Sequence, residues 1–412
     1  MRAVPPALPF FFFVLWLLAV PMEGPLLVVS GVSGTSIWFL LPLVACLLLT
    51  GRFISPVLLE KLAPWGAAAC GVATYALYLY PTMAPLLLSV MGIAATPITV
   101  RSAIGLLGAG QPLRAAAWCL VTTNLLLALL HQTRDFPAWP ILFALLPLMT
   151  LPGIVSAHES DVQKEPLAWE YLPFIFIFQV VSGLMYGFLF PAYAASGLMQ
   201  GLELVFYMLA VLGAVPLYRR DRDLLLLAGL SLGMLAFGLL QIGGAGGINL
   251  GMFAVMAAAG CIDLFLLALL LQSARPVKSF GFGLAALCGG IAAGQLLGLL
   301  LGDRAEAVGM AGSMALNIAA LALFLRHHLQ LRRVMDEREE SEEIPVELAC
   351  QLSNREQDIL RLVIRGRSYR EIAGQLGIAE STVKTHMRRI HEKAGVTDRK
   401  RLLLWLAQTR NP

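Results

Sequence analysis

The sequence predicts an all-α protein with two parts, a polytopic membrane bundle of about twelve helices and a small helical domain after it. Of the 412 residues, 58% are hydrophobic and 14% are charged, and the mean hydropathy is +0.76. Because soluble globular domains contain roughly 25% charged residues, most of these apolar side chains must face lipid. The last sixty residues differ, since basic residues and helix-capping signals are dense there.

Twelve apolar segments are long enough to span a membrane when the chain is read in windows of about 19 residues. The first can also be read as a secretory signal, but no small-residue cleavage pattern follows it, so we expect a retained helix. A polar segment, residues 157–166, separates six spans from six. The predicted spans are 8–29, 36–51, 62–80, 82–99, 113–131, 139–156, 171–190, 198–217, 223–242, 248–272, 279–301 and 306–326.

The charge of the loops predicts the orientation of these spans. With a cytoplasmic N-terminus, the inward loops carry ten Lys or Arg residues and the outward loops only two, Arg134 and Arg304. Such a bias follows the positive-inside rule, and an even number of spans returns the C-terminus to the cytoplasm. We therefore expect a multi-pass membrane protein with both termini cytoplasmic. The inward residues are Arg52, Lys61, Arg101, Arg114, Lys164, Arg219, Arg220, Arg222, Arg275 and Lys278.

The six-and-six arrangement is similar to the major facilitator fold, which implies two six-helix halves around a central cavity. The resemblance is architectural. The glycine, aspartate and arginine signature that this family has between spans two and three is not clearly present, since Gly51, Arg52, Glu60 and Lys61 occupy that loop. A transport cycle is the property that this departure puts in question.

Polar side chains inside the spans are costly to bury in lipid and are candidates for sensing a small molecule. Asp263 stands out because no cationic residue lies near it in the sequence, and Glu203 is the second carboxylate. The amides have an alternative role, since amides in membrane helices often only join one helix to the next. The full candidate set is Asp263, Glu203, Asn124, Gln179, Gln241, Gln295 and Asn317. Glycines at 290, 294, 298 and 302 recur every fourth residue and predict close helix packing.

The C-terminal segment contains the signals of a helix-turn-helix. Ser353 with Glu356, and Ser368 with Glu371, have the spacing of capping boxes ahead of apolar-periodic segments. Gly377 suits a left-handed helix end, and a basic third helix follows within a few residues. A basic helix after such a turn is typical of DNA recognition.

This segment resembles the DNA-binding domain of LuxR-type regulators, a four-helix module shared with NarL-like response regulators. The resemblance implies a bacterial protein, and hence that the membrane of the predicted spans is the inner membrane. The matching residues are Glu356, Ile359, Leu360, Ile372, Ala373, Ser381 to Lys384, His386, Lys393, Gly395 and Val396. Two residues depart from the pattern: Ala379 stands where the family usually has a serine cap, and Asp398 where asparagine is common. Losing the serine cap costs about 1 kcal/mol, which other contacts can offset.

The resemblance implies that the third helix enters the major groove of double-stranded promoter DNA. Lys384, Thr385 and Arg388 then read base edges, because they share one helical face and two of them have long donors suited to guanine. Ser381, Thr382, His386, Arg389 and Lys393 are expected at phosphates. Residues 353–412 contain 13 Lys and Arg against 6 Asp and Glu, a net charge of 13 − 6 = +7 that favours binding to phosphates. The resemblance also implies a homodimer, with pairing contacts on the fourth helix, residues 398–408, and half-sites about one helical turn apart.

A charged segment connects the two parts, and an acidic run within it, residues 336–347, has seven Asp and Glu. Strong helix formers precede Pro345, so the last span is expected to continue as a cytoplasmic helix that stops there. The acidic run either pairs with the basic domain in the absence of DNA or is merely solvated. The predicted domains are a transmembrane sensor (1–326), a charged linker (327–351) and the DNA-binding domain (352–412).

Two functions from different classes fit the sequence. One is a one-component transcriptional regulator whose membrane bundle senses a small molecule. The other is a secondary transporter with an attached regulatory DNA-binding domain. We expect no enzyme, cofactor or metal, because no nucleotide loop, metal-ligand cluster or nucleophile constellation rises above chance, and the six cysteines have no paired spacing.

Overall fold

A computed structural model of the chain describes residues 5–22, 27, 36–130, 138–152, 169–198, 201–302, 304–342, 346–364, 366–399, 401–402 and 405–406. These residues form helices and turns, with no strand among them. The chain divides into two compact units, Met1–Phe324 and Leu325–Pro412. The polar segment 157–166 and Arg134 lie outside the described residues.

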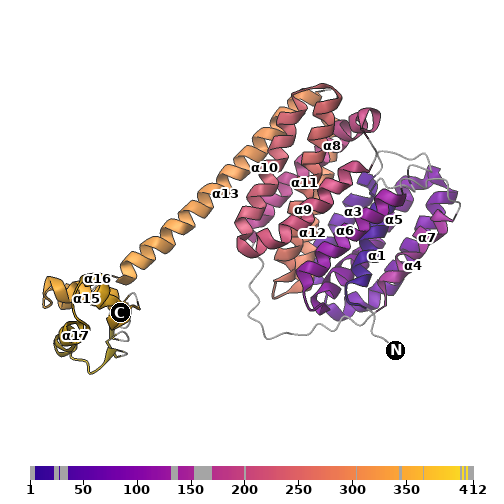
Figure 1. Cartoon of the computed structure of the whole chain (residues 1–412). Helices are drawn as coiled ribbons and strands as arrows, with labels where there is room; N and C mark the ends of the chain where they lie inside the picture. Colours follow the sequence, from indigo (N-terminus) through magenta and orange to yellow (C-terminus); the bar gives the residue numbers. More distant parts are fainter. Residues whose placement is uncertain are drawn as a thin grey trace. The chain divides into compact units, whose positions relative to one another are not determined.

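A helix overlaps each of the twelve predicted spans (Figure 1). The first half of the membrane unit contains α1 (Leu8–Ala19), α3 (Ser36–Phe53), α4 (Pro56–Leu79), α5 (Ala84–Gly105), α6 (Pro112–Leu130) and α7 (Trp139–Leu145), with short 3-10 helices η1 (Pro81–Met83), η2 (Leu106–Gly108) and η3 (Leu148–Thr150). The second half contains η4 (Trp169–Tyr171), α8 (Leu172–Ser196), α9 (Leu202–Arg220), α10 (Arg222–Leu240), α11 (Gly244–Leu271), α12 (Pro276–Leu301) and α13 (Ala305–Glu342).

Two of these helices, α1 and α7, are much shorter than the predicted spans. Among the described residues, 9 helices are long and apolar enough to cross a membrane, and the bent pair within Trp169–Ser196 makes a tenth. In the predicted span 8–29, the helix α1 ends at Ala19, close to Pro21, which disfavours helical geometry in the residue before it. Leu27 is helical, and residues 23–26 and 28–29 lie outside the described part. The predicted span 139–156 is interrupted at Pro147, which has no N–H to donate.

Glycines let the membrane helices approach closely. A Cβ added at Gly294 of α12 would lie 2.0 Å from the carbonyl oxygen of Val180 on α8, and one at Gly290 would lie 2.6 Å from Cβ of Gln179. The glycine stripe therefore packs α12 against α8, as the sequence predicted, but only in part. A Cβ added at Gly298 would lie 4.0 Å from the carbonyl oxygen of Leu184, an ordinary van der Waals distance, so this glycine is not required for close packing. Gly302 follows the last residue of α12 and has φ +53°.

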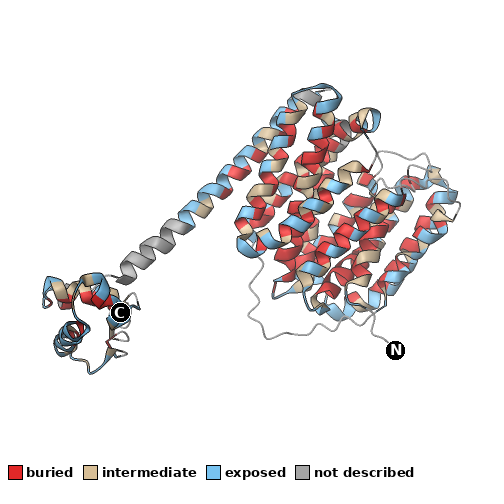
Figure 2. Ribbon diagram, in the orientation of Figure 1, coloured by how far each residue is buried: buried red, intermediate tan, exposed pale blue. Residues whose placement is uncertain are grey.

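The two halves meet along α3 and α12. A Cβ at Gly281 would lie 2.7 Å from Cα of Gly51, which places the backbones of these two helices in contact. At the other end of the same pair, Gln295 donates to the hydroxyl of Ser36 over 3.0 Å. Figure 2 shows buried residues on the faces that the helices of this unit turn toward one another.

The helix α13 is 38 residues long and continues beyond its membrane segment to Glu342. This confirms that the last span extends as a helix; residues 343–345 lie outside the described part. The acidic run begins inside this helix at Asp336, and its side chains are not described.

The C-terminal unit has a hydrophobic core of its own. It contains α14 (Val346–Ala349), α15 (Asn354–Ile364), α16 (Tyr369–Leu376) and α17 (Glu380–Ala394). Within the predicted fourth helix, residues 398–408, Asp398 lies in a bend and Arg399, Arg401, Leu402, Trp405 and Leu406 are helical, while Leu403 and Gln408 lie outside the described residues. The buried residues of this core are Leu348, Leu352, Ile359, Leu360, Val363, Ile372, Ala373, Val383, Met387, Ile390, Leu402 and Leu406.

Candidate functional site

The turn between α16 and α17 has the geometry of a helix-turn-helix. At the start of α16, Glu371 N–H donates to Ser368 Oγ over 3.3 Å, and the Glu371 carboxylate accepts from Ser368 N–H over 2.7 Å. At its end, Gly377 has φ +64°, the left-handed conformation that glycine adopts without strain. Ile378 N–H then donates to the Ala373 carbonyl over 3.0 Å. Both capping predictions for this helix are confirmed.

The start of α17 lacks a side-chain cap. Ala379 has the extended backbone of an N-cap, φ −70° and ψ 147°, but makes no side-chain hydrogen bond to the helix. The buried side chains Val383, Met387 and Ile390 recur at helical spacing and fix this helix on the domain core. Its opposite face is therefore available to a partner.

The predicted base-reading residues lie on this open face of α17. Lys384, Thr385 and Arg388 are exposed, and so are Ser381, Thr382 and Arg389, whereas His386 is half-buried. Lys384 Nζ lies 2.9 Å from the Glu380 carboxylate, and Arg388 Nε lies 3.7 Å from that of Glu392. Exposed pairs of this kind are worth little, so DNA can displace them.

Three further observations concern the predicted DNA-binding residues of α17. The Thr385 hydroxyl donates to the Ser381 carbonyl over 3.0 Å, which keeps that hydroxyl close to its own helix. The Nδ1 atom of His386 is buried without a hydrogen-bond partner among the described residues. The hydrogen bond from Lys384 is the main cause that holds the pKa of Glu380 below its ordinary value.

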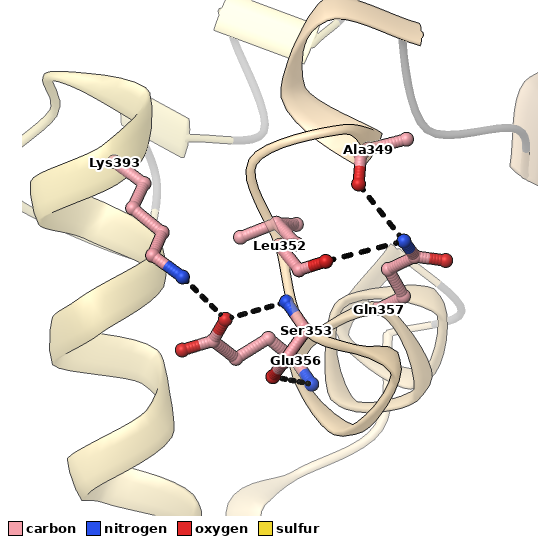
Figure 3. Close-up of polar contacts among 6 residues, drawn as sticks. All are labelled: Ala349, Leu352, Ser353, Glu356, Gln357 and Lys393. Atoms are coloured by element: carbon pink, nitrogen blue, oxygen red, sulfur yellow. Dashed lines mark hydrogen bonds and ion pairs between the residues drawn. The ribbon is translucent and has the colours of Figure 1, made fainter.

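Lys393 has an intramolecular partner that the sequence did not reveal (Figure 3). Its Nζ lies 2.6 Å from Oε2 of Glu356, whose side chain is 3% exposed. The same oxygen accepts the Ser353 N–H over 2.9 Å, and Ser353 Oγ accepts the Glu356 N–H over 3.4 Å. The first predicted capping box is thus present and is joined to the end of α17 by an ion pair.

The contacts of Glu356 set its pKa. Burial by itself raises the pKa of this carboxyl, but the hydrogen bonds from Lys393 and Ser353 outweigh burial and hold it below its ordinary value. Next to it, Gln357 Nε2 donates to the Ala349 carbonyl over 2.9 Å. Glu356 therefore connects α15 to the last turn of the recognition helix. Both ends of the pair were among the residues matched to the LuxR pattern, but nothing in their spacing indicated that they touch.

In the membrane unit, the structure brings Asp263 and Gln179 together. Asp263 on α11 accepts from Gln179 Nε2 on α8 over 3.4 Å and from the hydroxyl of Tyr207 on α9 over 3.1 Å. Gln179 is buried. No Lys, Arg or His contacts Asp263 in the part of the chain that the structure describes. Tyr207 was missed by the sequence analysis, which weighed amides and carboxylates but no hydroxyl in that span.

Glu203 lies in the first turn of α9 and not at the middle of a span. Its Oε2 accepts the hydroxyl of Tyr193 and the N–H of Gly201, each over 2.9 Å. A carboxylate in this position satisfies helix N–H groups and the helix dipole. These contacts support a capping role.

The remaining polar candidates do not contact the cluster of Asp263, Gln179 and Tyr207 among the described residues. Asn124 is buried and donates to the Leu120 carbonyl of its own helix over 2.9 Å. Gln295 pairs with Ser36, as described above. Gln241 is exposed at the end of α10, and Asn317 is exposed on α13. Asn249, which was not predicted, donates to the Ser196 carbonyl over 3.1 Å and so ties the end of α8 to α11.

The C-terminal segment carries a DNA-binding domain of a known family. Residues 350–406 match the model of the bacterial regulatory proteins, luxR family. The chain is 50% identical over 48 residues to the probable transcriptional regulatory protein NarL of Mycobacterium tuberculosis, and 48% identical over 46 residues to the transcriptional regulatory protein MctR of Rhizobium johnstonii. These matches cover 12% and 11% of this chain and 22% of each relative, so the chain spans about a fifth of the length of the curated relatives it matches.

The membrane unit is similar to solved transporter structures. A bacterial homologue of the iron transporter ferroportin, outward-facing with soaked iron, has a TM-score of 0.56 and 14% identity, covering 77% of this chain and 96% of that chain. A second outward-facing structure of such a homologue has a TM-score of 0.54 and 15% identity, covering 78% and 96%. At such low identity the likeness shows the fold alone. The predicted combination of a major-facilitator-like bundle and a LuxR-type domain is confirmed.

Proposed function

We propose that this protein is a membrane-embedded one-component transcriptional regulator, in which the bundle senses a small molecule and the C-terminal domain binds promoter DNA. The observation that carries the proposal is a luxR-type domain with an open basic face on α17, in the same chain as a membrane bundle with a transporter-like fold. The C-terminal domain fits a role in DNA binding, and the fold of the membrane bundle fits a role in binding small solutes. The proposed location is a bacterial inner membrane, with both termini cytoplasmic.

DNA recognition is assigned to α17. Lys384, Thr385 and Arg388 read base edges in the major groove, since they are exposed on the side opposite the packed residues Val383 and Met387. Ser381, Thr382, His386 and Arg389 contact phosphates. Release of Lys384 from Glu380 and of Arg388 from Glu392 costs little, because these ion pairs are exposed and screened.

Alanine in place of Lys384 or Arg388 should weaken specific DNA binding by about 1–3 kcal/mol each, or about 5- to 150-fold. The measurement is a titration of a fluorescent promoter fragment with purified full-length protein in detergent. Arg361→Ala is the matched control, because Arg361 is an exposed arginine on α15, paired over 3.7 Å with Asp358. The assignment is contradicted if each α17 variant binds target DNA and scrambled DNA with the same affinities as wild type.

Sensing is assigned to the cluster of Asp263, Gln179 and Tyr207. Burying the Asp263 carboxylate within the bundle costs free energy, because only neutral groups donate hydrogen bonds to it. A ligand that supplies a cation or further hydrogen-bond donors would stabilise this carboxylate. A ligand changes output only through its different affinity for two states, so a tenfold change in transcription requires about 1.4 kcal/mol of coupling.

Asp263→Asn should blunt the transcriptional response to an inducer while leaving protein level and DNA affinity unchanged. The inducer is found by screening a panel of small organic cations, acids and neutral solutes against a promoter reporter. Gln241→Ala is the control, because Gln241 is an exposed polar residue at the end of α10. Wild-type dose-response curves for Asp263→Asn and Glu203→Gln would make both carboxylates structural, and uptake of the inducer by vesicles would favour a transporter with an attached regulatory domain.

A further inference from the structure

The membrane segment of α13 has one packed face and one open face. The packed face lies against α10 and α8. A Cβ added at Gly312 would lie 2.8 Å from Phe237 of α10 and 3.3 Å from Val181 of α8, and one added at Gly233 of α10 would lie 3.0 Å from Leu316. Val308, Leu316, Ala319 and Leu323 are buried on this side. The opposite side consists of large apolar side chains with one amide among them.

That amide belongs to Asn317, ten residues into the membrane segment Ala307–Gln330. Asn317 is exposed and donates one N–H to the Ser313 carbonyl of its own helix over 2.9 Å. No other partner of this amide occurs among the described residues. Its second N–H and its carbonyl oxygen therefore face hydrocarbon, where lipid tails offer no hydrogen bond.

The exposed residues around Asn317 have the spacing of a helix-pairing seam. Met310, Met314, Asn317, Leu321 and Phe324 are separated alternately by four and three residues, and each is exposed. This alternation brings side chains to one side of a helix in the seven-residue repeat of coiled coils. The pattern continues in the sequence with His328, Leu331 and Met335, all within the same unbroken helix. The packed residues Gly312, Leu316, Ala319 and Leu323 fall at the positions of that repeat that point away from the seam.

We propose that a second copy of this chain packs in parallel along this face of α13, with the two Asn317 amides hydrogen-bonded to each other across the seam. A carboxamide both donates and accepts, so the same residue on a symmetry-related copy is its own complement. Asparagine at a single seam position fixes the register of paired helices. A lipid acyl chain satisfies the apolar side chains equally well, but it leaves the amide without a partner.

The continuity of the chain also selects a second copy as the occupant. α13 leads without a break from this seam to Glu342, shortly before the luxR-type DNA-binding domain, which we expect to pair as a homodimer. Parallel pairing of α13 in the membrane brings two such domains to the same side. This pairing surface is distinct from the predicted contacts of the fourth helix of the DNA-binding domain, and it does not require DNA.

Disulfide crosslinking in native membranes tests the geometry. A single cysteine introduced at Met314 or at Leu321, in a full-length chain whose six native cysteines are replaced by serine or alanine, should form covalent dimers with a membrane-permeant oxidant. Leu209→Cys on α9 is the matched control, since Leu209 is 60% exposed, the same as Met314. Covalent dimers of the Met314→Cys and Leu321→Cys chains, but not of the Leu209→Cys chain, support pairing along this face of α13. Equal crosslinking at all three positions indicates random collision and overturns it, as does a crosslink at 314 only to a different protein.

Substitution of the amide tests its role. Asn317→Leu should weaken self-association in detergent or bilayers by about 3- to 30-fold, the range that interhelical hydrogen bonds contribute in membranes. Asn317→Gln keeps the donor and acceptor and should retain most of the association. Unchanged association of Asn317→Leu overturns the proposal. The same measurements with Lys384→Ala separate this pairing from DNA binding, because self-association through the seam should be unchanged in a variant that binds its promoter more weakly.

Discussion

Replacement of Lys393 by alanine should destabilise the DNA-binding domain without removing a phosphate contact. The substitution leaves the Glu356 carboxylate, 3% exposed, bonded to Ser353 N–H but without its cation. Removing one partner of a fully buried pair costs about 3–5 kcal/mol. Because the Lys393 side chain is itself 36% exposed and solvent screens the pair, we expect a smaller loss, about 1–2 kcal/mol.

The pH dependence identifies the cause of this loss. Glu356 has a folded-state pKa below its ordinary value of 4.5, so its contribution to stability is present above 4.5 and lost as the pH falls through the lower, folded-state value. The hydrogen bond from Lys393 is the largest of the causes that lower this pKa. The stability difference between wild type and Lys393→Ala should therefore be full at pH 7 and shrink as the medium becomes more acidic than pH 4.5.

The assay is urea unfolding of residues 325–412, a compact unit with its own core, followed at several pH values. The salt dependence of DNA binding is measured on the same variant in the full-length chain. Loss of a phosphate contact would reduce the salt slope by about 1. A slope reduced by that amount with unchanged stability at pH 7 would refute the positioning role and return Lys393 to the phosphate contacts predicted from the sequence.

Two further predictions concern the missing cap and the orientation of the chain. Ala379→Ser should stabilise the C-terminal unit by about 0.5–2 kcal/mol in the same unfolding assay. The backbone of Ala379 already has N-cap geometry, and only the side-chain acceptor is absent. The control Ala379→Val adds bulk without an acceptor and should give no such gain in stability. Alkaline phosphatase should be inactive when fused after Arg220 or Lys278 and active when fused near Arg134 or Arg304, and the reverse pattern would contradict cytoplasmic termini, since this reporter requires the periplasm.

Sequence periodicity predicted most of the secondary structure because membrane helices and capping boxes are local features. A run of apolar residues, or a serine three residues before a glutamate, contains nearly all the information that the helix needs. The short helices α1 and α7 show where the conformational limits of proline oppose the prediction from hydropathy. Pro21 and Pro147 stop or interrupt helices that apolar composition alone would continue.

The contacts of the candidate sites were less predictable, because they join residues far apart in the chain. Asp263 and Gln179 are 84 residues apart, and Glu356 and Lys393 are 37 apart. Composition identified Asp263 as costly without indicating that Tyr207 would meet it. The resemblance to LuxR-type regulators made Lys393 an expected phosphate ligand, and the structure adds a partner inside the domain, the buried carboxylate of Glu356.

Pairing along α13 offers a way for the membrane bundle to regulate DNA binding without altering α17. Two DNA-binding domains held together bind adjacent half-sites with an effective concentration set by their connection, which raises joint affinity by about 10²–10⁴ without any new contact to DNA. The packed face of α13 lies against α8 and α10, and α8 also supplies Gln179 to the Asp263 cluster. A ligand at that cluster that shifts α8 can therefore change how α13 presents Asn317 to the partner. On this scheme Asp263→Asn and Asn317→Leu act on one equilibrium, so their effects on transcription should be less than additive, whereas Asp263→Asn and Arg388→Ala should be additive.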